Sequence, residues 1–362
     1  MSKRTSFLLC VALLSPPILS VKAPCQQRNQ PNWQVAKLAF DLPNDHLSPI
    51  TRIDIFMGKL VPGPASEMYV VDAPGSRPRK LAPGSHPVWS PDGSRLTFCA
   101  EGDSASKNDR WSAQIAVINA DGSGRKVLTA LDGGACFPDW SPDGKQIAFT
   151  GFGGKEAEIY VMDADGENVA AITAGYAPRW SPDGKVLLFL RPASYPDLDI
   201  WMASPDGKTT RKVVKADFTT QSPTWVPGHR GIAFSAKNSE GAQVIFRSRL
   251  DGNQPEQMTG ERWFGGNANP LFGGFWFEPN VAPDGVHFVA VACIAPVIGK
   301  GAHLVDGPTR HQDLFILWRD AEGCSLQREY GSQTPILLVD AETHKQSELA
   351  RGIHPSVLWV QK

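Results

Sequence analysis

The sequence lacks a surplus of charge of either sign. It has 36 Lys and Arg residues against 37 Asp and Glu residues, which gives a formal net charge of −1. This balance argues against a nucleic-acid-binding protein, because such a protein needs a basic surplus to displace counterions from phosphates. The body of the chain also lacks any apolar run near the roughly 18 residues of a spanning helix, so we expect no membrane span in the mature protein.

Cysteine is scarce, with 6 residues in 362, and no Cys-x-x-Cys pair or Cys/His cluster has the spacing of a zinc site. The Gly-x-Ser-x-Gly motif is missing as well, which argues against a serine peptidase. The chain does have a hydrophobic share of 41%, with 11 Trp and 17 Phe residues. That composition excludes a disordered chain and allows a large core.

The first residues form a separate segment. The basic pair Lys3-Arg4 precedes an apolar stretch that two prolines interrupt. We interpret residues 1–23 as a bacterial secretory signal peptide and residues 24–48 as an N-terminal extension. Cys25 lacks the Leu-Ala-Gly type sequence that usually precedes a lipid-modified cysteine, so we expect no lipid anchor there.

Two motifs alternate along the rest of the chain. Trp-Ser-Pro-Asp-Gly stands at 89–93, 140–144 and 180–184, with degraded copies beginning at Trp225 and Val281. The second motif has the form Ile-Tyr-Val-Met-Asp-Ala-Asp-Gly and occurs in six copies. The first five copies start 41 to 47 residues apart, and a gap of about two periods precedes the sixth. This period is typical of one four-stranded propeller blade.

Each repeat contains the signals of a four-stranded meander. Pro-x-Trp-Ser predicts a short strand, and Pro-Asp-Gly predicts a tight turn, because Pro fixes φ and Gly accepts positive φ. An apolar triplet such as Ile147–Phe149 predicts the second strand, and Asp-Ala-Asp-Gly turns the third strand into the fourth. One such sheet cannot bury both faces, so neighbouring repeats must stack.

We therefore predict an all-β, six-bladed β-propeller of four-stranded antiparallel blades over residues 49–362. Blade one is expected from strands near 52–57, 68–72 and 79–82, and a C-terminal strand at 355–360 completes it and closes the ring. An insertion at about 294–334 interrupts the last blade. Leu314–Gly323 imitates the third-strand motif, which leaves seven blades as the alternative.

The paired motifs resemble the WD40-like repeat of TolB-type propellers, from about residue 50 to 360. The resemblance implies the fold much more than the function, because propellers serve many functions. TolB carries a small α/β domain before its propeller. Only about 25 residues lie between the signal and the first predicted blade here, so we expect a TolB-like protein without that domain.

The long and variable loops mark the expected working face. Loops between strands two and three, and between blades, differ in length, whereas the turns on the opposite face are short and uniform. Rigid scaffolds carry function on their variable loops. Aromatic residues on a Gly-rich stretch would stack on a sugar or a partner's side chain, and charged residues of the insertion would bind a peptide or acidic ligand. The candidates are Trp263, Phe264, Trp276, His303, Arg310 and His311.

Both groups have a simpler alternative, which is that the rings pack onto the blades and the charged loop is merely solvated. Four cysteines fall on the same face and are candidates for disulfides. Cys293 and Cys324 bracket the insertion, and Cys99 and Cys136 are the second candidate pair on this face.

The residue before each blade's proline is expected at the mouth of the central channel. Glu278, His354 and His86 hold this place in three adjacent blades, and two imidazoles with a carboxylate could hold a divalent metal. The alternative that we favour is a pair of histidines that neighbouring loops satisfy. We accordingly expect no cofactor.

The leading functional hypothesis is an exported, non-enzymatic propeller, periplasmic or secreted, that serves as a protein-binding or scaffolding module of the cell envelope. Its partner would be an envelope or secreted protein and not a nucleic acid. The alternative is a carbohydrate-active enzyme, a lyase or hydrolase, that binds a saccharide at the channel mouth.

Overall fold

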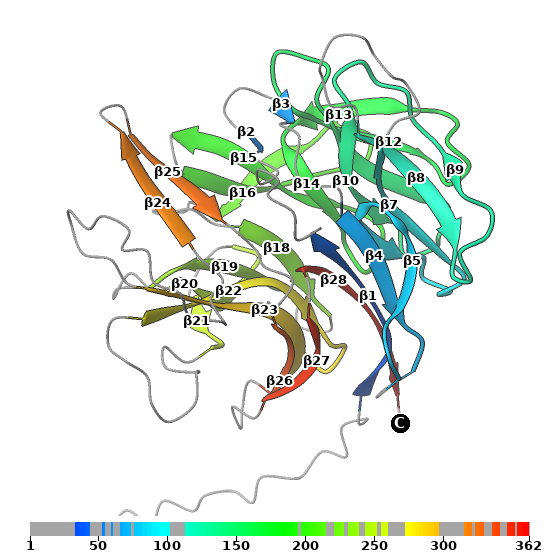
Figure 1. Ribbon diagram of the computed structural model, residues 1–362. Helices are drawn as coiled ribbons and strands as arrows, with labels where there is room; N and C mark the ends of the chain where they lie inside the picture. Colours follow the sequence, from blue (N-terminus) through cyan, green and yellow to red (C-terminus); the bar gives the residue numbers. More distant parts are fainter. Residues whose placement is uncertain are drawn as a thin grey trace, which may run out of the picture. The chain divides into compact units, whose positions relative to one another are not determined.

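The chain divides into two units, Met1–Pro31 and Asn32–Lys362, and the computed structural model describes residues of the second unit only (Figure 1). The described residues are 33–43, 53–54, 59–60, 66–73, 76–101, 113–194, 197–214, 221–227, 231–238, 243–251, 255–259, 272–296, 315–320, 323–328, 335–340, 346–351 and 353–361. Within these ranges the regular structure is entirely β, and no residue is helical. This confirms the predicted all-β class.

The strands form six four-stranded antiparallel blades. Blade one contains β28 (Ile353–Gln361), β1 (Trp33–Pro43), β4 (Ser66–Val71) and β5 (Arg79–Pro83). Blade two contains β6 (Ser85–Trp89), β7 (Arg95–Glu101), β8 (Ala113–Asn119) and β9 (Lys126–Val127). Blade three contains β10 (Ala135–Trp140), β11 (Gln146–Gly151), β12 (Glu158–Asp163) and β13 (Ala170–Ala174).

The remaining three blades follow the same order from the innermost strand outward. Blade four contains β14 (Tyr176–Trp180), β15 (Leu187–Ser194), β16 (Asp197–Ala203) and β17 (Thr210–Val214). Blade five contains β18 (Gln221–Val226), β19 (Gly231–Lys237), β20 (Gln243–Arg249) and β21 (Glu256–Gln257). Blade six contains β22 (Phe272–Val281), β23 (His287–Pro296), β26 (Pro335–Asp340) and β27 (Gln346–Arg351).

The first and last described strands close the ring. β28 pairs with β1 along almost its whole length, from Trp33 opposite Gln361 to Asp41 opposite Ile353 (Figure 1). The innermost strands of neighbouring blades contact one another all the way round, in the order β28, β6, β10, β14, β18, β22 and back to β28. The predicted closure by the C-terminal strand is confirmed.

The second strand of blade one differs from the prediction. It is β1, Trp33–Pro43, which pairs with both β28 and β4. The segment near 52–57, which the sequence analysis placed there, instead contains β2 (Ile53–Asp54), paired only with β3 (Lys59–Leu60). That assignment was wrong, and the blade begins before the boundary expected at residue 49. Leu38, Ala39 and Phe40 are each at most 1% exposed, so β1 is buried on both faces, as a strand inside a blade must be.

The insertion in blade six contains a separate hairpin. β24 (Phe315–Asp320) and β25 (Gly323–Arg328) pair with each other, and no other described strand belongs to their sheet. The third strand of blade six is β26, which follows the insertion. The stretch at 314–323 that imitates a third strand therefore starts no seventh blade.

The hydrophobic core lies between the blades. The tryptophans of the repeated motif, Trp89, Trp140 and Trp180, are each at most 6% exposed. Each packs in a cluster with side chains of the preceding blade. Lys37 lies 5.2 Å from the Trp89 ring centre and Arg95 lies 5.0 Å from that of Trp140, both reaching across from the preceding blade. Stacking of this kind explains why the repeat needs neighbours.

The short turns satisfy their own polar groups. In the Trp-Ser-Pro-Asp-Gly turns, the Ser hydroxyl donates to the Asp two residues on, over 2.6 Å in the Ser90–Asp92 pair. The same hydroxyl accepts the backbone N–H of Arg95 over 3.0 Å. Hydrogen bonds from Ser90 and Ser94 hold the pKa of Asp92 down to about 2.

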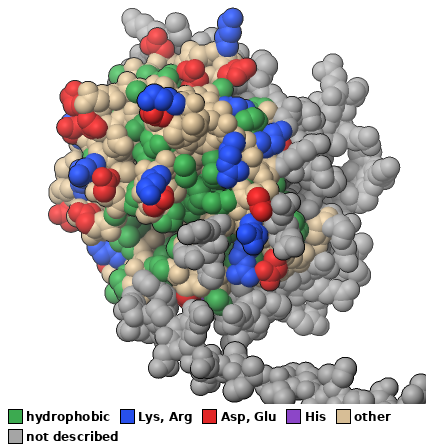
Figure 2. Space-filling view, turned by 180° about the vertical axis from the view of Figure 1, so that it is seen from behind, with side chains coloured by type: hydrophobic (Ala, Val, Ile, Leu, Met, Phe, Trp, Pro, Cys, Tyr) green, Lys and Arg blue, Asp and Glu red, His purple; other side chains and the backbone are tan. Residues whose placement is uncertain are grey.

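Over the described surface in Figure 2, Lys and Arg side chains are interspersed with Asp and Glu around hydrophobic ones.

Candidate functional site

Each innermost strand bulges where the chain passes through its proline. The register shifts between Ser85 and Val88 in blade two and at the equivalent place in blades three to six. We call the residues directly before these prolines the rim residues; they are His354, His86, Phe137, Ala177, Ser222 and Glu278. They lie at the end of the blades from which the long loops emerge.

Three rim residues adopt a backbone conformation that side chains disfavour. His86, Phe137 and Ala177 have φ of 53°, 56° and 53°. A left-handed conformation at a non-glycine residue is uncommon and costs on the order of 1 kcal/mol or more. It persists only where the surroundings fix it, so each of these residues must be held by specific contacts.

A side chain from the preceding blade provides that contact. The backbone N–H of His86 donates to Asp41 Oδ1 over 3.1 Å, and that of Ala177 donates to Thr150 Oγ1 over 3.0 Å. The N–H of Phe137 points at Cys99 Sγ in the same way, at 3.3 Å. We call each of these contacts a blade latch. In all three blade latches the acceptor residue directly follows the buried phenylalanine of its blade's second strand.

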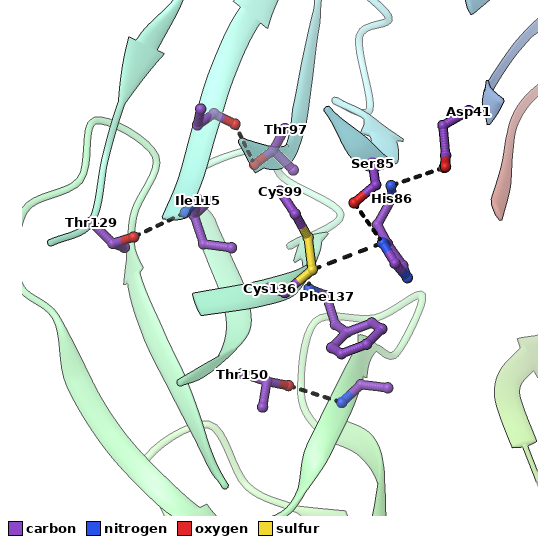
Figure 3. The surroundings of a disulfide bond; sticks show 12 residues. Asp41, Ser85, His86, Thr97, Cys99, Ile115, Thr129, Cys136, Phe137 and Thr150 are labelled. Atoms are coloured by element: carbon purple, nitrogen blue, oxygen red, sulfur yellow. Dashed lines mark hydrogen bonds between the residues drawn. A yellow bond between two sulfur atoms is a disulfide. The ribbon is translucent and has the colours of Figure 1, made fainter. Parts of the chain in front are cut away.

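A disulfide strengthens the latch between blades two and three. Cys99 of β7 is bonded to Cys136 of β10, and both residues are 3% exposed. The two residues are 37 positions apart in the sequence. Figure 3 shows the bond beside the rim, with His86 and Phe137 close to it.

The imidazole of His86 lies against the disulfide and blade three. Its Nδ1 is 3.1 Å from Ser85 Oγ and 3.8 Å from Cys136 Sγ (Figure 3). The ring also meets the Phe137 ring edge to face, with centroids 4.6 Å apart. Phe137 in turn contacts Phe152 at 6.5 Å between centroids. This part of the rim thus combines half-buried aromatic surface with an imidazole.

Deeper along the innermost strands, a second set of contacts joins neighbouring blades. Asp139 Oδ2 accepts the backbone N–H of Trp180 over 2.7 Å, and Oδ1 lies 3.4 Å from Arg179 Nη1. Burial raises the pKa of Asp139 to about 6, although Arg179 and the N–H both oppose this rise. Ser356 Oγ accepts the N–H of Trp89 across the junction of blades one and two, over 3.1 Å.

Five of the predicted binding residues fall outside the described residues; they are Trp263, Phe264, His303, Arg310 and His311. Other predicted residues lie on described strands, but their side chains are not described. These are Trp276 and Glu278 on β22, Cys293 on β23, Cys324 on β25 and His354 on β28.

The predicted metal site of His86, Glu278 and His354 therefore stays untested. The backbone brings their strands together, since β28 contacts both β6 and β22. Within the part of the chain whose side chains are described, one group of three potential metal ligands occurs, and it is a different one: His86, Cys99 and Cys136.

The sequence analysis did not identify Asp139, and it did not identify the side chains that act as acceptors in the blade latches. The acceptors carry a recognisable signal, which is a polar residue after the second-strand phenylalanine, as in Phe40-Asp41 and Phe149-Thr150. In blades four and six the equivalent residues are Leu190 and Val291, so the signal is present in only part of the ring of blades.

No helix in the described ranges is long and apolar enough to cross a membrane.

Residues 103–295 match the TolB beta propeller domain family (PD40). The uncharacterized protein Atu1656 of Agrobacterium fabrum is 31% identical over 134 residues, which cover 36% of this chain and 43% of that protein. The chain thus matches less than half the length of this curated relative.

Solved structures share the fold at low sequence identity. TolB from Acinetobacter baumannii aligns over 90% of this chain and 67% of its own, with a TM-score of 0.57 and 18% identity. Hydrazine synthase of Kuenenia stuttgartiensis aligns over 91% of this chain and 47% of its own, with a TM-score of 0.58 and 15% identity. Likeness at such identities supports the propeller fold alone. Because the family match spans more than half of its 362 residues, the chain belongs to the TolB β-propeller domain family.

Proposed function

We propose that this protein is an exported, non-enzymatic propeller that binds a protein partner in the cell envelope, either in the periplasm or after secretion. The observation that carries the proposal is the rim at blades two and three, where half-buried Phe137 and His86 are held in strained backbone conformations. Membership of the TolB propeller family supports the same class of function.

The fixed geometry of the rim favours binding of a protein surface. Phe137 is anchored by its N–H contact to Cys99, and its ring is positioned by His86 and Phe152. An aromatic side chain that is already ordered loses little entropy on binding, and such residues often dominate interface energies. The opposite face offers less, because its turns direct their serine and aspartate groups toward one another.

Export is supported by two independent features. The first 23 residues have the basic and apolar composition of a secretory signal. The Cys99–Cys136 disulfide suits an oxidising compartment, since such bonds are rare in the bacterial cytosol. Cell fractionation and N-terminal sequencing of the mature chain test this part of the proposal, and a cytosolic chain that keeps Met1 would contradict it.

Site-specific photo-crosslinking in living cells tests partner binding. The photoreactive residue p-benzoylphenylalanine would replace Phe137 in one variant and Val169 in a control. Val169 belongs to the same blade, is 45% exposed and lies in a short turn on the opposite face. We expect a protein adduct of defined mass from position 137 and none of that mass from position 169.

Two results would overturn the proposal. One is the absence of any protein adduct at position 137 when the variant is exported and folded. The other is the same set of adducts, in the same yield, from both positions, because this would indicate random collision.

A further inference from the structure

We propose that reduction of the Cys99–Cys136 disulfide creates a binding site for a thiophilic metal ion of the Zn²⁺ class, held by the two sulfurs and the imidazole of His86. The site differs from the His86, Glu278 and His354 set predicted from the sequence. It shares His86 with the rim, but its test requires no protein partner.

The donor atoms are already gathered. One imidazole nitrogen of His86 and the sulfurs of Cys99 and Cys136 all lie within 4.8 Å of one another. Zn²⁺ binds thiolate sulfur at about 2.3 Å and imidazole nitrogen at about 2.0 Å. Once the sulfur–sulfur bond is broken, small side-chain rotations therefore suffice to surround one ion. Two cysteines and one histidine are a known zinc donor set, in which the fourth position stays open.

The Cys99 sulfur is held in place by a contact from the next blade. In the other latches, the atom that receives the N–H of the next blade is an oxygen, from Asp41 or from Thr150. The Cys99 sulfur occupies that position and receives the N–H of Phe137. The same N–H can donate to this sulfur after reduction, which keeps the Cys99 side chain beside the rim.

The imidazole of His86 is oriented before any metal arrives. Its backbone is fixed by Asp41, and its ring rests edge-on against Phe137 (Figure 3). With the proton on Nε2, the Nδ1 lone pair accepts from the Ser85 hydroxyl and is directed toward Cys136. A metal ion would replace the Ser85 hydrogen as the partner of that lone pair. Fixed orientation of a histidine ligand raises metal affinity.

The closed ring of blades does not depend on the disulfide alone. The junctions on either side of blades two and three are held by the Asp41 and Thr150 latches. Across the junction between these two blades, Trp140 Nε1 also donates to the Val88 carbonyl over 3.3 Å. Reduction therefore leaves the two sulfurs next to each other and next to His86.

The chemistry balances with a dithiol as the reductant. The dithiol transfers two electrons and two protons, so that the Cys99–Cys136 bond breaks into two thiols and the reductant forms its own disulfide. Zn²⁺ then binds both sulfurs and releases the two thiol protons. In an oxidising compartment the disulfide persists and the site is closed, so metal binding reports reducing conditions.

The test uses Co²⁺ as a spectroscopic substitute for Zn²⁺ on the full mature chain. The oxidised chain, the chain reduced by a dithiol and then freed of reductant without air, and a reduced Cys136→Ser variant are each titrated. We expect the reduced wild-type chain alone to bind one additional Co²⁺, with thiolate-to-metal charge-transfer absorption that Zn²⁺ abolishes. All three samples contain the remaining cysteines, so the difference isolates this pair.

A pair of histidine variants completes the test. His86→Ala should weaken Zn²⁺ binding at least about tenfold. His287→Ala should leave it unchanged, because His287 pairs with Asp284 in a short turn of blade six. The proposal is overturned if the reduced chain shows no charge-transfer band, if His86→Ala binds as tightly as His287→Ala, or if circular dichroism shows that reduction alone unfolds the propeller.

Discussion

The backbone N–H of Ala177 donates a hydrogen bond to Thr150 Oγ1 over 3.0 Å, across the junction between blades three and four. The same relationship links His86 to Asp41 and Phe137 to Cys99. At three successive junctions a carboxylate, a sulfur and a hydroxyl thus each face the backbone N–H of the residue before the next blade's proline. At these three junctions the position after the second-strand phenylalanine carries a contact between blades.

Removing one latch should destabilise the ring locally. Thr150→Ala leaves the half-buried N–H of Ala177 without its acceptor. We expect the free energy of unfolding to fall by about 1–2 kcal/mol, as measured by urea denaturation. Thr150→Ser is the matched control because it keeps the hydroxyl, and it should lose clearly less. Equal losses in both variants would show that the methyl group, and not the hydrogen bond, matters.

The Cys99–Cys136 disulfide should contribute more to the free energy of unfolding than a blade latch formed by a hydrogen bond alone. Cys136→Ser removes the bond to Cys99, and we expect a loss of about 2–4 kcal/mol in unfolding free energy under oxidising conditions. Cys99→Ser keeps an oxygen acceptor for the Phe137 N–H and should cost a similar amount. The double variant should lose little beyond either single one, because all three lack the same bond. Additive losses would contradict this interpretation.

The sequence predicts the blades well because each blade repeats a local signal. Turn residues and a buried tryptophan recur within one period, and the signal does not depend on distant contacts. It fails at blade one for a physical reason. The Ser-Pro-Asp-Gly turn joins strands one and two in blades two to four, and degraded copies stand at this place in blades five and six. In blade one the same two strands are β28 and β1, at opposite ends of the chain. The motif that marks a second strand therefore cannot exist there.

Another signal for β1 is present but weak. Lys37-Leu38-Ala39-Phe40 repeats the pattern of Gln146-Ile147-Ala148-Phe149, although no turn motif precedes it. The latches were harder to foresee, because the donor and the acceptor lie on different blades. Whether a polar residue such as Thr150 faces the next blade or solvent follows only from how the blades stack.

Asp139 should make stability depend on pH. Its pKa is about 6 in the folded chain against an ordinary 3.8, so the folded chain holds this proton more tightly than the unfolded chain does. The stabilisation from proton binding is complete below about pH 4 and is lost as pH rises through about 6. Asp139→Asn cannot titrate. Its stability relative to wild type should therefore rise between pH 4 and pH 7, by on the order of 1–3 kcal/mol.

Urea denaturation of both proteins across this pH range measures the effect. The amide oxygen of asparagine can still accept the N–H of Trp180, so the two proteins differ mainly in charge. A stability difference that stays constant with pH would refute the role assigned to Asp139.

Two tryptophans of the same motif should respond differently to the same substitution. Trp140 and Trp180 are 5% and 6% exposed, but Trp140 Nε1 donates to the Val88 carbonyl, whereas Trp180 Nε1 is buried with no acceptor among the described residues. Replacement by Phe removes a hydrogen bond at one position and an unsatisfied donor at the other. Trp140→Phe should be more destabilising than Trp180→Phe by about 1 kcal/mol in chemical denaturation. The reverse order would contradict the assignment.

Truncation tests where the propeller begins. A chain that starts at Asn32 keeps β1, whereas one that starts at Asn44 lacks it and leaves β28 and β4 without the strand between them. Burial of Leu38 and Phe40 alone contributes about 1.5–3 kcal/mol for each side chain, and the loss of β1 also exposes two strand edges. We expect the first chain to melt cooperatively at the temperature of the mature protein and the second to aggregate or lack a cooperative transition. Equal melting of the two chains would mean that the blade can close without Trp33–Pro43.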